Sequence, residues 1–145
     1  MKTLLFIFGL FIFISSCGPS KNSTSGQDIS ALRGTWQLNY ISGTRISFDG
    51  LYPDKKPELT FETTKKKISG NTSCNSFSGV FTVDGKKLNI ADNLIMTKMA
   101  CGGDGETIFL QALKKINGYD VTTGYALTLL IDNVAMMRFT KISGS

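Results

Sequence analysis

Residues 70–81 read GNTSCNSFSGVF, and this stretch decides the fold. Its second half places Phe77, Gly79 and Phe81 at every other position, which predicts a strand with one buried face. Residues 71–76 are too polar for a core strand, and their Asn and Ser side chains can hydrogen-bond the neighbouring backbone. We therefore expect a tight polar corner that leads into a strand of an antiparallel sheet.

One cysteine lies in this stretch and another in a second one, MTKMAC, at residues 96–101. We expect Cys74 and Cys101 to form a disulfide, with two free buried thiols as the alternative. Closing the loop between them would stabilise the fold by roughly 3–4 kcal/mol in the chain-entropy account. The chain has no histidine, and two cysteines alone do not make a tetrahedral zinc site, so we expect no metal.

The first sixteen residues have the pattern of a signal peptide. Lys2 gives a positive start, and the apolar run over residues 4–14 is shorter than the about 20 residues that a membrane-spanning helix needs. Residues 14–17 read ISSC and resemble the lipobox of bacterial lipoproteins, whose cysteine becomes the new N-terminus and carries lipid. Cys17 is then the lipid anchor. The alternative is a plain secretory signal cleaved near Ser16, which would leave a free thiol.

Residues 17–28 contain no large apolar side chain, so we expect a flexible tether there. Gly18 stands where an Asp would favour the inner membrane under the best-known lipoprotein sorting rule. The lipobox resemblance therefore implies an envelope lipoprotein of the outer membrane, and export makes a disulfide permissible. Residues 29–145 form one domain, large enough for a single core.

The sequence of this domain predicts short strands separated by turn residues. Apolar and polar residues alternate over Arg33–Ile41, which predicts a half-buried strand. We expect its Trp36 to anchor the core, with stacking on a ligand as the alternative. Ile46 and Phe48 predict a short extended piece, and Asp84-Gly85 indicates a type I′ hairpin. Further strands are expected at residues 58–63, 65–70, 77–83, 88–90, 94–100, 119–122, 125–131 and 134–141.

One helix is predicted, between residues 104 and 116. Asp104 is the expected N-cap, Glu106 lies in the positive first turn, and Gly118 is a natural stop. The strand spacing, with this helix before the last three strands, predicts a mainly β antiparallel barrel or sandwich of about eight strands. Its core should contain Phe61, Phe77, Phe81, Met96, Met99, Phe109 and Phe139.

These residues together resemble the META domain family, also called HslJ-like, over nearly the whole mature chain. The first hallmark is a glycine, then Cys-Asn, then an aromatic residue and a glycine; the second is Thr-x-Met-x-Cys. The matching residues are Gly70, Cys74, Asn75, Phe77 and Gly79, and then Thr97, Met99 and Cys101. Further matches are Trp36, Leu38, Gly43, Leu59, Phe61, Glu106, Phe109, Leu113, Leu127, Leu129 and Phe139. One departure is Ser73, where many relatives have a glycine or another small residue.

The resemblance implies a compact, lipocalin-like β-barrel that is partly open, with the helix packed on it. It implies no reaction, because the family has no agreed chemistry, and its links to heat stress, antibiotic tolerance and virulence are associations. The residues themselves also indicate no enzyme. The commonest general base is absent, no serine lies in a nucleophile elbow or a Ser-x-x-Lys motif, and no phosphate loop or dinucleotide fingerprint is present. We expect no cofactor.

We therefore expect a monomeric, lipid-anchored binding or stress-tolerance module whose partner is another envelope protein or a cell-wall component. The predicted contact surface joins the corner residues Asn71, Ser73, Asn75 and Ser76 to the basic run Lys65, Lys66 and Lys67. As a functional patch, the basic run could touch acidic lipid headgroups or polysaccharide; the alternative is a solvated hairpin tip kept soluble by its lysines. For Asn75 the alternative is formation of the corner through its side-chain amide. A carrier of a small apolar ligand is the alternative function. We expect no nucleic-acid partner, since the net charge of +5 is modest and no aromatic stripe accompanies it.

Overall fold

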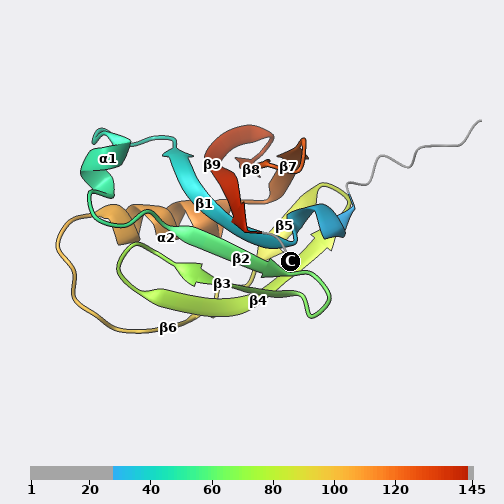
Figure 1. Cartoon of the computed structure of the whole chain (residues 1–145), viewed down its shortest axis with the longest axis horizontal. Coiled ribbons are helices and arrows are strands. Elements are labelled where there is room, and N and C mark those ends of the chain that lie inside the picture. The colour runs from blue at the N-terminus through green and yellow to red at the C-terminus, as the bar shows by residue number, and fades with distance from the viewer. Residues whose placement is uncertain (1–27, 144–145) are drawn as a thin grey trace, which may run out of the picture.

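The computed structural model describes residues 28–143 (Figure 1). The predicted signal peptide (residues 1–16), the predicted lipid anchor Cys17 and the predicted tether up to residue 27 lie outside these residues. Within the described range, no helix is both long enough and apolar enough to cross a membrane.

Nine strands and three short helical segments make up the described domain. The strands are β1 (Gly34–Ile41), β2 (Glu58–Glu62), β3 (Lys67–Asn71), β4 (Ser76–Asp84), β5 (Lys87–Ile90), β6 (Ile95–Met96), β7 (Gly118–Thr122), β8 (Ala126–Ile131) and β9 (Val134–Ser143). The helices are the 3₁₀ turn η1 (Ile29–Leu32), the single turn α1 (Phe48–Leu51) and the longer α2 (Gly105–Lys115). The predicted strands and the predicted helix are thus present, in the predicted order.

Eight of the strands close into a ring, and all their pairings are antiparallel. The order is β3-β2-β1-β9-β8-β7-β5-β4, and β4 pairs again with β3; β6 is a ninth strand beside the start of β4. The ring is uneven, because β5 and β7 pair only at Lys87 and Gly118, with hydrogen bonds from Leu88 N to Asn117 O (3.2 Å) and from Tyr119 N to Lys86 O (3.0 Å). The prediction of a partly open antiparallel barrel is confirmed.

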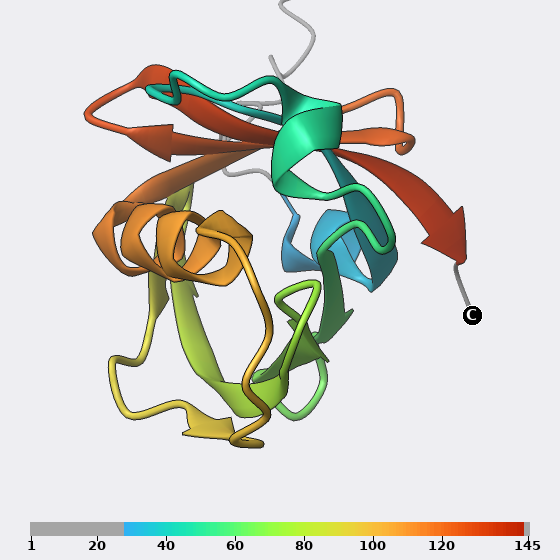
Figure 2. The ribbon, with the colours of Figure 1, turned by 90° about the vertical axis from the view of Figure 1, so that its left-hand side faces the viewer.

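The interior of the ring is filled by aromatic and aliphatic side chains. Trp36 is fully buried and its indole Nε1 donates to Leu32 O at 2.7 Å, so η1 closes over it and the predicted core anchor is confirmed. Phe61 and Phe81 meet edge to face with ring centroids 5.1 Å apart. In Figure 2, α2 lies between the red strand β9 and the yellow-green strand β4, and its Phe109 side chain is fully buried in the core.

The backbones of β2 and β3 approach closely at Gly70, which pairs with β2 on one side and β4 on the other, and this explains why the residue is a glycine. A Cβ atom there would lie 2.0 Å from Glu58 O, so no side chain fits. The β8–β9 turn at Asp132-Asn133 has both φ angles positive (48° and 67°), as a type I′ turn requires. At Gly85-Lys86 only the glycine has a positive φ (58°). This pattern matches type II′ and corrects the type I′ prediction for this hairpin.

Three local predictions were wrong. The piece containing Ile46 and Phe48 is not extended but leads into α1, whose start is capped by the Ser47 hydroxyl, which accepts from Gly50 N at 3.2 Å. The strand expected at residues 94–100 is reduced to Ile95–Met96. Met99 is 58% exposed and does not belong to the core; Met96 is half-buried.

Candidate functional site

The Cys74–Cys101 disulfide is formed, with its Cα atoms 6.0 Å apart. It ties the corner after β3 to the irregular segment that leads into α2, so the sequence prediction is confirmed. Cys101 is exposed and Cys74 is half-buried, which places the disulfide at the surface rather than in the core.

Asn75 is the centre of this region, and its side chain is 2% exposed. Its amide oxygen accepts from Met99 N at 2.7 Å and from Thr97 Oγ1 at 2.8 Å. Its amide nitrogen donates to Met99 O at 3.1 Å and to the carboxylate of Glu106 at 3.1 Å. The Asn75 side chain therefore makes the hydrogen bonds to Met99 that a neighbouring strand would otherwise make. Through Thr97 and Glu106 it also links this segment to α2.

Glu106 holds the other side of this network from the first turn of α2. Its carboxylate accepts from the Thr72 hydroxyl and from Asn75 N (3.2 Å). The positive end of the helix dipole also stabilises a carboxylate in this position. Asp104 occupies the N-cap position as predicted, but its backbone angles are helical (φ −98°, ψ −1°) and its side chain makes no capping hydrogen bond.

The corner itself is made by Asn71 and Thr72. Asn71 Oδ1 accepts from Ser73 N at 3.1 Å, and Thr72 Oγ1 accepts from Asn75 N at 2.9 Å. These local bonds let Ser73 adopt a positive φ of 83°. The polar corner was predicted. The Asn75 amide, however, does not shape it but reaches out to other segments.

Tyr52 links α1 to α2 and is 2% exposed. Its hydroxyl donates to Gly105 O at 3.1 Å, and burial raises its pKa to about 12. A Cβ at Gly105 would lie 2.7 Å from Leu51 O and 2.8 Å from the Tyr52 ring, so the glycine allows this contact. Sequence reasoning assigned no role to Tyr52 or Thr72. The only signal was the short spacing from Thr72 to the Cys-Asn pair.

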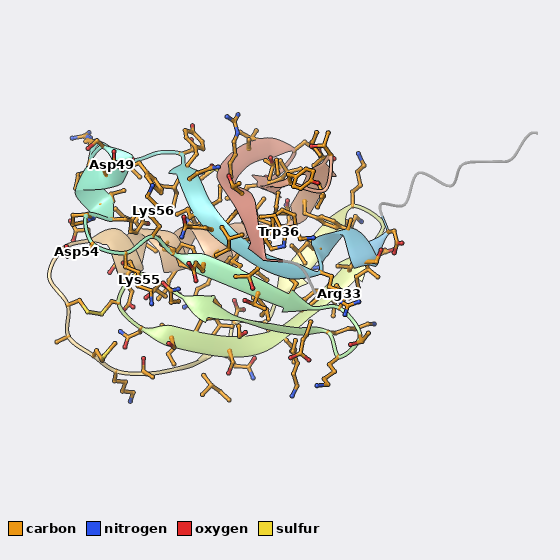
Figure 3. All side chains as sticks on the ribbon, in the orientation of Figure 1. Arg33, Trp36, Asp49, Asp54, Lys55 and Lys56 are labelled. Atoms are coloured by element: carbon orange, nitrogen blue, oxygen red, sulfur yellow. A yellow bond between two sulfur atoms is a disulfide. The ribbon has the colours of Figure 1, made fainter. Side chains whose placement is uncertain are left out.

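These segments surround a cleft of about 350 Å³ at the surface. The disulfide, Ser73, Glu106 and Tyr52 are among the residues that line it. Asp54 and Lys55 supply charges from the loop after α1, and Figure 3 shows both at the α1 end of the molecule. The cleft is thus lined by four segments: residues 51–55, 73–74, 99–103 and 105–107.

The structure separates the two halves of the predicted contact surface. Lys65, Lys66 and Lys67 are exposed at the β2–β3 turn, whereas the corner follows the other end of β3, roughly 15 Å away along the strand. Asn71 (8% exposed) and Asn75 are buried, so the accessible corner residues are Ser73, which is half-buried, and Ser76, which is exposed.

Four further cavities border the described residues. They are lined by turns, strand edges and one side of α2. Across residues 28–143, no three Cys, Asp or Glu side chains gather into a group that could hold a metal ion.

The two hallmark motifs therefore meet in space: Cys74 bonds Cys101, and Asn75 binds Thr97 and both backbone polar atoms of Met99. The sequence profile of the META domain matches residues 28–143. No curated protein sequence matches this chain.

Several solved structures share the fold. One is a protein from Burkholderia xenovorans determined by NMR, 23% identical with a TM-score of 0.58, where the alignment covers 87% of this chain and 97% of that one. Another is a crystal structure of a DUF4847 family protein from Bacteroides vulgatus, 16% identical with a TM-score of 0.55, covering 79% and 96%. A third, also determined by NMR, is 24% identical with a TM-score of 0.55, covering 76% and 90%. At these identities the likeness shows the fold alone.

Proposed function

The chain belongs to the META domain family, and from this membership we propose that it is a lipid-anchored, non-enzymatic protein of the bacterial envelope that binds a partner at the disulfide-walled cleft. Cys17 carries the lipid, and residues 18–27 connect it to the domain. The lipobox-like ISSC at residues 14–17 supports the anchor. The Cys74–Cys101 disulfide supports export, because such bonds persist in oxidising compartments.

The observation that carries the binding role is the preorganised cleft. Its walls come from three parts of the chain that are distant in the sequence, residues 51–55, 73–74 and 99–107. The disulfide, the buried Asn75 amide and the Tyr52 hydroxyl hold them in one arrangement. A site that is ordered before binding loses less conformational entropy when a partner arrives. A cleft whose walls are already held in place therefore favours binding of a partner.

A non-enzymatic role is supported by the chemistry of the cleft. The chain contains no histidine, and the oxygens of Glu106 already accept hydrogen bonds from Thr72 and Asn75. The partner we propose is another envelope protein or a cell-wall component, bound by a monomer at the outer membrane. No observation favours the carrier of an apolar ligand, which needs an apolar interior cavity.

Site-specific photocrosslinking in intact cells tests this proposal. A photoreactive residue is placed at Asp54, on the cleft, and in a matched strain at Asn133, in the exposed β8–β9 turn. We expect a defined adduct from position 54 that is absent from position 133, and a deletion strain more sensitive to heat or to envelope-directed drugs. The same adducts from both positions, or none from either, would contradict the cleft as the binding site.

A further inference from the structure

The ring has one end at which positive charge gathers. We call it the tether end and define it by η1, the β2–β3 turn and the β4–β5 turn, which lie together at the right of Figure 1. Its basic residues are Arg33, Lys65, Lys66, Lys67, Lys86 and Lys87, all exposed. The acidic residues near them are Asp28, Glu62, Asp84 and Asp120.

Only part of this positive charge is neutralised. Lys65 pairs with Glu62 (3.1 Å) and Lys86 with Asp120 (3.6 Å). Within residues 28–143, Arg33, Lys66, Lys67 and Lys87 take part in no ion pair.

The opposite end of the ring is balanced. It carries Arg45, Lys55, Lys56 and Lys98 against Asp49, Asp54, Asp104 and Glu106. Figure 3 shows Asp49, Asp54, Lys55 and Lys56 together at the α1 end, far from Arg33. The tether end therefore accounts for +2 of the net charge of +3 that residues 28–143 carry.

The chain leading to Cys17 joins the domain at this same end. Asp28, the first described residue, caps η1 through Ser30 N at 3.0 Å. Burial, together with the nearby Asp28 carboxylate, raises the pKa of Tyr119, and Tyr119 N bonds Lys86 O in the β4–β5 turn. Arg33 precedes Gly34, which pairs with Phe61 at the start of the β2–β3 hairpin turn. The entry point of the chain and both lysine-bearing turns are thus neighbours.

We propose that the tether end docks on the anionic phospholipid headgroups of the leaflet that holds the lipid on Cys17, so that the cleft points away from the bilayer. The inference rests on the proposed lipid anchor. Residues 17–27, fully extended, reach no more than about 40 Å, which keeps the domain near the surface. Basic side chains are attracted to an anionic surface only within about a Debye length of roughly 10 Å, so the end nearest the anchor is the end that docks.

Lysine footprinting of the lipidated mature chain on vesicles tests the orientation. One vesicle preparation contains about 30% phosphatidylglycerol in phosphatidylcholine and the other phosphatidylcholine alone, and a short pulse of an amine-reactive reagent is read by mass spectrometry. We expect labelling of Lys66, Lys67 and Lys87 to fall roughly threefold on the anionic vesicles and to recover in about 0.5 M NaCl. Lys55, Lys56 and Lys98 should be labelled equally on both.

Co-flotation with neutral vesicles separates the two proposals. A chain that does not float has no lipid anchor, which overturns the proposed anchor. A chain that floats but shows equal lysine labelling on both vesicles is anchored without docking, which overturns this inference alone. Equal protection of the same lysines by a soluble acidic polysaccharide on neutral vesicles also overturns the assignment to lipid.

Charge-reversal variants supply the matched control. Combining Lys66→Glu, Lys67→Glu and Lys87→Glu should abolish the difference in labelling of Lys65 and Lys86 between the two vesicles. Combining Lys55→Glu, Lys56→Glu and Lys98→Glu, at the opposite end, should leave that difference unchanged. All six positions are exposed and lie outside the buried core, so both variants should fold. Equal effects of the two triple variants would overturn the proposal.

Discussion

The side-chain amide of Asn75 holds groups that lie 22 to 31 residues away in the sequence. Its oxygen and nitrogen satisfy the backbone N–H and C=O of Met99, which have no strand partner at that point. Satisfying buried polar groups matters more than the net gain from one hydrogen bond, because an orphaned group retains its full desolvation cost. Asn75 is therefore a structural residue that holds Met99 in the cleft wall.

Asn75→Asp should lower the free energy of unfolding by about 3 kcal/mol. The substitution removes the donors to Met99 O and Glu106 and places a second carboxylate beside the first. Denaturant unfolding at neutral pH with the disulfide intact measures the change, and Asn89→Asp, on the exposed side of β5, is the control. A loss below about 0.5 kcal/mol would contradict the assigned role.

Burial of Tyr52 predicts a loss of stability in alkali. Its pKa is about 12 in the folded protein against about 10 in the unfolded chain, so its contribution is complete below pH 10 and is lost as the pH rises toward 12. The free energy of unfolding should fall by about 1–2 kcal/mol over that range.

Tyr52→Phe should reduce this fall, whereas Tyr125→Phe, at a side chain that is 72% exposed, should not. Denaturant unfolding at several pH values between about 9 and 12 measures both variants. Equal alkaline slopes for the two variants would count against a buried Tyr52 phenol.

The order of elements could be read from the sequence, because alternation of apolar residues and turn chemistry are local. Leu59 and Phe61, or Leu127 and Leu129, mark their strands without reference to anything distant. The strand predicted over residues 94–100 is confined to Ile95–Met96, because the Asn75 side chain and the disulfide, rather than sheet pairing, hold residues 99–101. The sequence also could not show that the Asp104 side chain makes no capping bond, since the contacts of Glu106 with Thr72 and Asn75 come from a distant part of the chain.

Removing the disulfide should loosen one element and leave the ring closed. Replacing Cys74 and Cys101 by serine should lower the free energy of unfolding by roughly 3 kcal/mol. Under native conditions, amide exchange should accelerate in residues 100–104 far more than in β1 or β9. Uniform acceleration across the ring would contradict this separation. As a direct check, the unreduced protein should show no titratable thiol at either cysteine.

Gly70→Ala tests the close approach of β2 and β3. The added Cβ would lie 2.0 Å from Glu58 O, a backbone atom that cannot move aside, so we expect a loss of about 2–4 kcal/mol by thermal or denaturant unfolding. Gly102→Ala is the matched control, because nothing lies within 4 Å of its Cβ position. Similar stabilities of the two variants would mean that β2 and β3 are further apart.

At the scale of the whole molecule, the local pattern of apolar and polar residues could not predict that the strands close into a ring. The pairing of β5 with β7 joins segments on either side of α2 through a single residue pair. The sequence of neither strand indicates which strand it pairs with. The cleft arises in the same way, from loops brought together by the ring. The strand spacing left a barrel and a sandwich both open, and the resemblance to the family selected the barrel.

Anchoring is also a property of the whole molecule, and Cys17→Ala tests it. In growing cells the parent chain should incorporate labelled palmitate and partition into the detergent phase, and the variant should do neither. Cys101→Ser, which leaves residue 17 intact, is the control and should still be lipidated. Lipid incorporation by the Cys17→Ala variant would contradict the anchor.

The opposite placement of the tether and the cleft has a mechanical consequence. The chain enters β1 at Gly34, and β1 is hydrogen-bonded to β2 on one side and to β9 on the other. In the proposed arrangement, a force between the bilayer and a partner bound in the cleft acts along β1. The hydrogen bonds of β1 to β2 and to β9 are then loaded in shear, so they must break together. A pull between residues 28 and 143 would instead peel β1 from β9 one bond at a time. If the chain is anchored as proposed, the domain would therefore resist tension along its attachment better than tension applied at its two termini.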